Sequence, residues 1–249
     1  MRSRLWRLPD SASASTLTAM NTEQPPTPAV DAATPPPSPA QPAAITLELH
    51  ELAASYGARI VFRGVSLTLQ AGEVLVVSGA NGSGKSTLLR LLCGLQQPTA
   101  GTIAYHWQGQ VYQPIAARPL IGWVAPDLAL YRELSGLENL RFFAAVRERS
   151  PSDTDLYALL EQVGLGGRGD DLVAAYSSGM THRLRYAYAL LHQPPVLLLD
   201  EPTVTLDTRG AAVVDQVIAR QRTHGISVIA TNDPRELRYG NYVLTLNPV

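Results

Sequence analysis

The chain has 249 residues, 45% of them apolar, with 20 basic residues against 21 acidic ones and a formal net charge of −1. This is enough apolar sequence for a sizeable core in one or two domains. Because the positive and negative charges nearly balance, the composition does not indicate a nucleic-acid partner. A single cysteine, Cys93, excludes an intrachain disulfide framework, and no run of about 18 apolar residues predicts a membrane-spanning helix.

The first 44 residues differ in composition from the rest of the chain. They hold nine of the 19 prolines, and Ser, Thr and Ala fill most of the remainder. Such a segment has too little apolar surface to offset the entropy of ordering it. We therefore expect a disordered, partly polyproline arm over residues 1–44. Its start resembles a targeting peptide in composition, but we expect either a dispensable extension or a start codon placed too early, with Met20 as the true start.

Strands are expected from the point where the pattern changes. Residues 45–49 and 65–69 alternate between apolar and polar, as half-buried strands do. Residues 74–77 form a short, continuous apolar run between glycines, which predicts a strand buried on both faces. A glycine-rich turn follows, and then residues 86–92 are apolar at helical spacing.

That turn matches the phosphate-binding pattern G-x-x-x-x-G-K-[ST] without a gap, between the strand and helix that the pattern requires. Its glycines let successive backbone N–H groups point at phosphate oxygens, and the helix N-terminus adds its dipole. Lys85, the one lysine among 20 basic residues, supplies a compact cation, and Ser86 a hydroxyl ligand for Mg²⁺. The predicted ATP-binding residues are Gly79, Ala80, Asn81, Gly82, Ser83, Gly84, Lys85, Ser86 and Thr87.

The second half of the chain alternates between helical and strand patterns. Helices are expected over residues 137–149, 156–163 and 211–222, and buried strands over residues 121–125, 196–199 and 226–230. Strands that alternate with helices predict an α/β fold with a mainly parallel sheet.

Two acids end the strand at residues 196–199. Ligands bind beside the carboxyl ends of parallel strands, so Asp200 and Glu201 are candidates for the same site as the phosphate loop. We expect Asp200 to help hold Mg²⁺ and Glu201 to orient or deprotonate the attacking water. Lys85 and Glu201 are thus predicted catalytic residues.

With these motifs in this order, the chain from Ile45 onward resembles the ATP-binding subunits of ABC transporters. The stretch of residues 176–180 is similar to the signature motif of that family, in which a serine and a glycine touch the γ-phosphate held by an opposite subunit. Ser177 and Gly179 match these positions, whereas Tyr176 and Met180 differ from the family's Leu and Gln.

The resemblance implies a P-loop NTPase fold of the RecA type over residues 45–249. It has a parallel core, an antiparallel β subdomain, and a helical subdomain inserted at about residues 127–185. Tyr56 matches the aromatic residue that stacks on adenine, although an ordinary strand aromatic remains the alternative. Asp207 matches an aspartate that crosses the dimer interface.

Two positions depart from the family pattern. Pro126 stands where the family usually has a glutamine, and the neighbouring Asp127 is a candidate to substitute for it. Asn232 stands where the family usually has a switch histidine. Asn donates a hydrogen bond to a phosphate oxygen but does not titrate near neutral pH. We therefore count Asn232 among the catalytic residues and expect slower hydrolysis or altered coupling.

The resemblance implies an ATPase with ATP and Mg²⁺ as cofactors, peripheral on the cytoplasmic face of the cell membrane. Its expected partners are a separate transmembrane permease and a second ATP-binding subunit, in a homodimer that sandwiches two ATP molecules. A narrower similarity points to the ATPase subunits of the haem exporter of cytochrome c maturation. Two alternatives stay open: a soluble ABC ATPase, for example in iron–sulphur assembly, and a weakly hydrolysing, nucleotide-dependent regulatory module.

Overall fold

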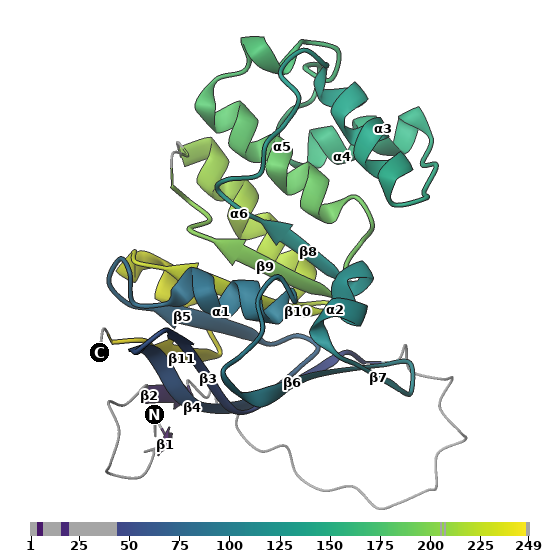
Figure 1. Cartoon of the computed structure of the whole chain (residues 1–249). Coiled ribbons are helices and arrows are strands. Elements are labelled where there is room, and N and C mark those ends of the chain that lie inside the picture. The colour runs from purple at the N-terminus through teal and green to yellow at the C-terminus, as the bar shows by residue number, and fades with distance from the viewer. Residues whose placement is uncertain (1–3, 7–15, 20–43, 205, 207, 248–249) are drawn as a thin grey trace, which may run out of the picture.

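The computed structural model describes residues 4–6, 16–19, 44–204, 206 and 208–247 (Figure 1). Its central element is a sheet of seven strands in the order β1-β2-β11-β5-β10-β9-β8. The strands β11, β5, β10, β9 and β8 run parallel to one another. Their bounds are β1 Arg4–Trp6, β2 Thr16–Ala19, β5 Val74–Ser78, β8 Ile121–Val124, β9 Val196–Asp200, β10 Ile226–Thr231 and β11 Tyr242–Thr245.

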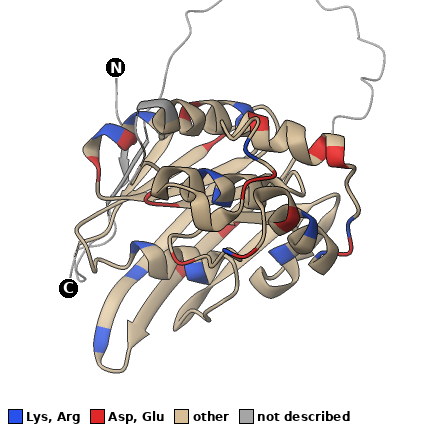
Figure 2. Ribbon diagram, turned by 90° about the horizontal axis from the view of Figure 1, so that it is seen from above, with Lys and Arg blue, Asp and Glu red and all other residues tan. Residues whose placement is uncertain are grey.

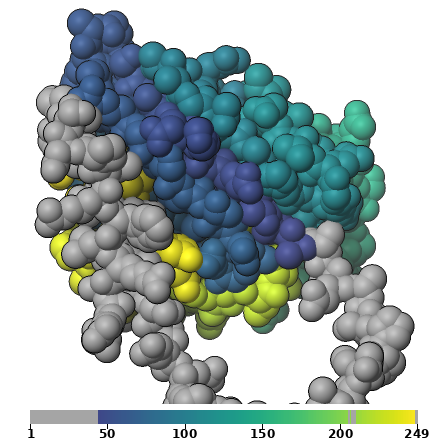
Figure 3. Space-filling model, turned by 90° about the horizontal axis from the view of Figure 1, so that it is seen from below, coloured from purple at the N-terminus to yellow at the C-terminus, as the bar shows by residue number. Residues whose placement is uncertain are grey.

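A second sheet is antiparallel and has the order β4-β3-β6-β7. Its strands are β3 Thr46–Tyr56, β4 Arg59–Gln70, β6 Ala100–Trp107 and β7 Gln110–Tyr112. Seen from below, β3 and β4 form a diagonal band across one face of the molecule, between the C-terminal residues and the residues that follow β6 (Figure 3). The predicted antiparallel subdomain is therefore present.

The helices fall into two groups. α1 (Lys85–Leu92) and α6 (Thr208–Gln221) pack on the parallel sheet, whereas α3 (Gly136–Val146), α4 (Asp153–Gln162) and α5 (Ser178–Leu190) form a lobe beyond β8 (Figure 1). A helical lobe is therefore present, as the resemblance implies, and its last helix ends at Leu190. The short pieces are α2 Pro114–Ala117, η1 Arg118–Leu120, η2 Val173–Ala175 and η3 Pro234–Tyr239.

The apolar runs of the parallel strands are buried on both faces, as continuous runs predict. Alternate residues of β5 divide between two cores: Leu75 and Val77 face the core that α1 shares with the antiparallel sheet, and Val74 and Val76 face the core under the helical lobe and α6. β9 divides in the same way. The sheet therefore lies between two hydrophobic layers, and this holds its strand ends in fixed positions.

The expected strands and helices are present, but β3 extends seven residues beyond the expected end at residue 49 and β4 begins six residues before the expected start at residue 65. The patterns missed β6, β7, β11 and the full extent of α5. In the N-terminal arm, where we expected disorder throughout, β2 pairs with β11 and β1 with β2, so that expectation differs from the structure at residues 4–6 and 16–19. The remainder of residues 1–43 lies outside the described residues.

Acidic and basic residues are interspersed over the described part of the molecule (Figure 2). None of the described helices is long and apolar enough to cross a bilayer.

Two buried histidines predict a loss of stability in acid. His182 and His192 are 4% and 7% exposed, and burial, with nearby arginines, lowers the pKa of each to about 4. In the unfolded chain each histidine binds a proton below about pH 6.5, whereas in the folded chain it stays neutral down to about pH 4. The free energy of unfolding is therefore unaffected by these histidines above about pH 6.5 and falls toward about pH 4, by about 1.4 kcal/mol per pH unit per histidine. His192→Gln should remove one of these contributions from the pH dependence of denaturant unfolding. An unchanged pH dependence would contradict the assignment.

Candidate nucleotide-binding site

The order of the parallel strands brings the predicted site residues together. β5, β10, β9 and β8 are consecutive neighbours, so the segments that follow them emerge at the same edge of the sheet. These segments carry the phosphate loop after β5, Asn232 after β10, Asp200 and Glu201 at the end of β9, and Asp127 after β8.

The phosphate loop closes on the start of α1. Gly84 occupies the N-cap position with a φ of 104°, a left-handed conformation that favours glycine, and a Cβ there would collide with the side chain of Val61. No side chain caps this end of α1, so its first backbone N–H groups are available to an anion. The loop geometry therefore fits the phosphate site that the motif predicted.

Lys85 is folded inward at the centre of the loop. Its side chain is only 6% exposed, and its ammonium group donates to the carbonyl oxygens of Gly79 at 2.9 Å and Ala80 at 3.2 Å. The same Nζ lies 3.6 Å from Oε1 of Glu201. A loop lysine and a carboxylate 116 positions later in the chain are thus partners across one small site.

Asp200 is buried, with 5% of its surface exposed. Burial raises the pKa of its carboxyl group, while a hydrogen bond with the Ser86 side chain and the charge of Lys85 act in the opposite direction. A buried carboxylate beside a hydroxyl is the kind of oxygen donor set that Mg²⁺ accepts while keeping several waters. Ser86 and Asp200 therefore fit the predicted metal site.

Glu201 has an unusual backbone conformation, with a φ of 50° in the left-handed region. Its N–H donates to the carbonyl oxygen of Ala230 at 2.8 Å, and its Oε2 accepts from the backbone N–H of Asn232 at 3.3 Å. The side chain remains partly exposed, at 21%. The carboxylate is thus held at the mouth of the site, where a water molecule can approach it.

Asn232 links two parts of this site. Its backbone donates to Glu201, and its side-chain Nδ2 donates to Oδ1 of Asn81 in the phosphate loop at 3.0 Å. Asn81 was predicted as a phosphate-loop residue, but its contact with Asn232 could not be foreseen because 151 positions separate them. The structure therefore places the amide of Asn232 beside the loop that would hold the phosphates.

Tyr56 lies at the end of β3 and is 52% exposed. Its hydroxyl donates to Oε1 of Gln96 at 2.9 Å and accepts from the Thr87 hydroxyl at 3.3 Å. The ring is therefore fixed at its far end beside α1 and keeps an accessible face, which stacking on a flat base requires. Gln96 was not among the predicted site residues, since nothing in its local pattern marks it.

Ser177 and Gly179 lie in the helical lobe at the start of α5, on a different part of the molecule from the phosphate loop (Figure 1). The Ser177 hydroxyl caps α5 by accepting from the backbone N–H of Met180 at 3.2 Å. Tyr176, the first departure in this motif, is a buried anchor whose hydroxyl donates to the carbonyl oxygen of Arg168 at 2.7 Å. Asp207 lies outside the described residues.

The segment after β8 differs from a freely solvated loop. Arg185 of α5 is half-buried and donates from Nε to the carbonyl oxygen of Leu128 at 3.2 Å. Asp127 is exposed, and its charge contributes to the raised pKa of Asp200. This hydrogen bond joins α5 to the segment after β8, although 57 residues separate its two partners in the chain.

The fold and the site define a P-loop nucleotide-binding protein with an inserted helical lobe. The family model described as "ABC transporter" matches residues 62–204. The chain belongs to the ATP-binding proteins of the ABC transporter family, which are ATPases that act in transport with a permease.

Individual relatives agree with this assignment. The chain is 38% identical to the cytochrome c biogenesis ATP-binding export protein CcmA of Pseudomonas syringae, over 76% of this chain and 89% of that protein. The structure of cbiO1 from Clostridium perfringens, part of an ABC transporter complex, is 27% identical with a TM-score of 0.69, over 82% of this chain and 86% of that one. A dimeric bacterial ABC transporter cassette shares the fold, with 23% identity and a TM-score of 0.71 over 81% of this chain and 94% of its own.

Proposed function

We propose that this chain is the ATP-hydrolysing subunit of a membrane transporter, with its catalytic centre formed by Lys85, Asp200, Glu201 and Asn232. The observation that carries the proposal is the contact between Lys85 and Glu201, 3.6 Å apart, at the edge of the sheet where the phosphate loop ends. A cation for the phosphates and a carboxylate for the attacking water thus lie side by side.

The residues divide the chemistry between them. The phosphate loop and the start of α1 bind the phosphates, and the Lys85 ammonium exchanges the carbonyl oxygens of Gly79 and Ala80 for phosphate oxygens. Glu201 orients the water and takes up its proton, and Asn232 donates to the terminal phosphate. Tyr56 stacks on the base.

Mg²⁺ supplies charge neutralisation between the terminal phosphates when it is bound. Ser86 and Asp200 would hold it, because the hydroxyl and the buried carboxyl already face each other. The neighbouring Asp127 adds negative charge at the same edge, which favours a divalent cation there.

A second copy would complete each site. The N-terminus of α5, capped by Ser177, offers backbone N–H groups to an anion but lies in the helical lobe, apart from its own phosphate loop. A head-to-tail homodimer would present Ser177 and Gly179 to the ATP of the partner subunit. The dimeric structure of a cassette with the same fold supports the formation of a dimer.

The permease contact is proposed for an aromatic cluster on the helical lobe. Its members are Tyr131, Phe142, Phe143 and Tyr188, with successive ring centroids 4.7–5.3 Å apart. Tyr131 and Phe142 are 47% and 41% exposed, and nearby Val146 is 66% exposed. Exposed apolar side chains that gather on one surface mark a contact with another protein. This contact would place the chain on the cytoplasmic face of the membrane.

A pull-down from detergent-solubilised native membranes tests this contact. The protein should retain a multi-span membrane protein, and Phe142→Glu should lose it while keeping basal ATP hydrolysis. Val111→Glu is the matched control, because Val111 is also exposed, at 60%, but lies on β7 of the antiparallel sheet and not on the helical lobe. Recovery of soluble partners alone, or equal recovery by both variants, would contradict the proposal.

Asn232 should contribute to turnover through one hydrogen bond. Asn232→Ala is expected to lower kcat about tenfold, the effect of losing one charge-assisted donor of about 1.4 kcal/mol. Asn232→His should restore turnover and make it depend on pH at about pH 6.5, because an imidazole titrates there. Rates of ATP hydrolysis between about pH 5.5 and 8 check both expectations. Unchanged turnover in the alanine variant would remove Asn232 from the catalytic centre.

The narrower role in haem export for cytochrome c maturation is also a proposal. Its support is the 38% identity to the Pseudomonas protein named for cytochrome c biogenesis. Deletion of the gene should then abolish mature c-type cytochromes, detected by haem staining, and the Glu201→Gln variant should fail to restore them.

A further inference from the structure

The turn that carries Glu201 is held from two directions. The turn runs from Glu201 to Val204, closed by a hydrogen bond from the Val204 N–H to the Glu201 carbonyl oxygen at 3.2 Å. Glu201 starts it in a left-handed conformation, which costs a non-glycine residue free energy and persists only where surrounding contacts enforce it. The residues that hold Pro202 and Thr203 therefore decide where the Glu201 carboxylate lies.

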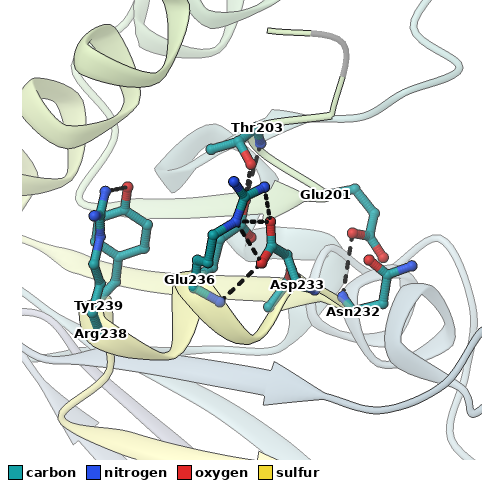
Figure 4. Close-up of polar contacts among 9 residues, drawn as sticks. Glu201, Thr203, Asn232, Asp233, Glu236, Arg238 and Tyr239 are labelled. Carbon is teal, nitrogen blue, oxygen red and sulfur yellow. Dashed lines mark hydrogen bonds and ion pairs between the residues drawn. The ribbon is translucent and has the colours of Figure 1, made fainter. Parts of the chain in front are cut away.

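Glu236 of η3 provides the first hold. Its side chain is 3% exposed and points toward Thr203 (Figure 4). Its Oε1 accepts from both the backbone N–H of Thr203, at 3.2 Å, and the Thr203 hydroxyl. Its carboxyl group is also within reach of the Thr231 side chain, on the strand that precedes η3. Burial of a carboxyl group costs free energy, which hydrogen bonds must offset. Because one oxygen of Glu236 binds both polar groups of Thr203, this side chain anchors the turn.

The short helix η3 is itself fastened at both ends. Asp233 caps its start by accepting from the Arg235 N–H at 2.9 Å. At its other end, Arg238 and Tyr239 both donate to Asp215 of α6 (Figure 4 shows the Arg238–Tyr239 pair). Glu236 therefore lies in a short helix that is fixed at both ends and that begins soon after Asn232.

Tyr186 of α5 provides the second hold. The ring is fully buried, and its hydroxyl donates to the carbonyl oxygen of Pro202 at 2.9 Å. The ring of His182, one turn earlier in α5, lies 5.6 Å from it and packs in the same region. The turn after β9 is thus bound to the helix that begins with the Ser177 motif.

We propose that Tyr186 and Glu236 are positioning residues for ATP hydrolysis: together they hold Pro202 and Thr203, and so keep the Glu201 carboxylate facing Lys85 and the Asn232 backbone. Neither residue touches the reacting atoms. The inference rests on the catalytic role proposed for Glu201. It assigns a function to two buried polar groups in the helical lobe and η3 that the site itself does not use.

The test separates positioning from stability with a matched pair of tyrosines. Tyr186→Phe should lower kcat about tenfold, the effect expected for one lost hydrogen bond, with KM for ATP and binding of a fluorescent ATP analogue unchanged. Tyr105→Phe removes an equally buried hydroxyl that donates to the Leu92 carbonyl oxygen at 2.8 Å, away from the turn. Tyr105→Phe should lower Tm about as much as Tyr186→Phe does, but it should leave kcat unchanged. Equal kcat in the two variants would overturn the proposal.

Glu236 is tested by rescue. Glu236→Gln keeps an oxygen that accepts from Thr203 and should retain kcat within about threefold, whereas Glu236→Leu should lose at least about tenfold. Thr203→Val removes the partner hydroxyl and answers the same question should Glu236→Leu not fold. Wild-type kcat in Glu236→Leu or Thr203→Val, or equal loss in the Gln and Leu variants, would overturn the proposal.

A parallel measurement on Glu201→Gln keeps the two proposals apart. If Glu201→Gln is inactive and the positioning variants are normal, only the present inference fails. If Glu201→Gln retains wild-type turnover, the catalytic role of Glu201 fails, and the inference falls with it.

Discussion

Lys85→Arg should abolish ATP hydrolysis while leaving the fold intact. The ammonium group sits inside the phosphate loop, 2.9 Å from the Gly79 carbonyl oxygen and 3.6 Å from Glu201. A planar guanidinium keeps the charge but is larger and rigid, so it cannot take the place of a compact cation in a site this small. We expect a loss of at least about 100-fold in kcat/KM, as for removal of one transition-state donor.

Hydrolysis rates, ATP binding and Tm together check this expectation. Arg90→Lys is the matched control, since it makes the opposite exchange on the exposed face of the same helix and should leave turnover unchanged. Lys85 is also the chain's one lysine, so a lysine-directed reagent should label a single side chain besides the N-terminus, and ATP should protect it. Near-normal turnover by Lys85→Arg, or labelling that ATP does not reduce, would refute the assignment.

Glu201→Gln should have the second large effect, with hydrolysis reduced at least about 100-fold and ATP binding retained. The amide keeps the size of the side chain and can still approach Lys85 and the Asn232 N–H, which the carboxylate contacts at 3.6 Å and 3.3 Å. It cannot accept a proton from water. Because ATP would bind without being consumed, the variant should also form an ATP-dependent dimer that is stable during size-exclusion chromatography.

The control for this variant is Glu133→Gln, an equal change at an exposed position in the helical lobe. It should hydrolyse ATP at the normal rate and show no ATP-stabilised dimer. A Glu201→Gln protein that hydrolyses ATP at the rate of this control would exclude Glu201 as the base. A monomer in the presence of ATP would contradict the proposed head-to-tail dimer.

Local sequence determined the parts of the site that depend on short-range geometry. The strand–loop–helix of the phosphate loop is contiguous, so the glycines, Lys85 and Ser86 could be assigned with their roles before any tertiary contact was known. The acids at the end of β9 could be assigned for the same reason, because a buried apolar run shows where a strand ends. The inserted helical lobe came from the family resemblance rather than from periodicity.

Two features of the structure show where short-range sequence patterns are insufficient. β11 was missed because its four residues give too little pattern, and its pairing with β5 crosses more than 160 residues of chain. Arg185 of α5 donates to the carbonyl oxygen of Leu128, which lies 57 residues earlier in the chain. In both cases the partner is remote in sequence, and its presence leaves no mark on the local composition.

The sequence by itself identified a P-loop ATPase, and it predicted which residues bind the phosphates and which residue carries the catalytic carboxylate. Only the tertiary structure decided how these residues meet: the order β5-β10-β9 places Asn232 between the phosphate loop and Glu201. It also decided that Tyr186 and Glu236 hold the Glu201 turn. The physical reason is that a motif records backbone geometry over a few residues, whereas a hydrogen bond between distant segments depends on which strands become neighbours when both faces of the sheet are buried.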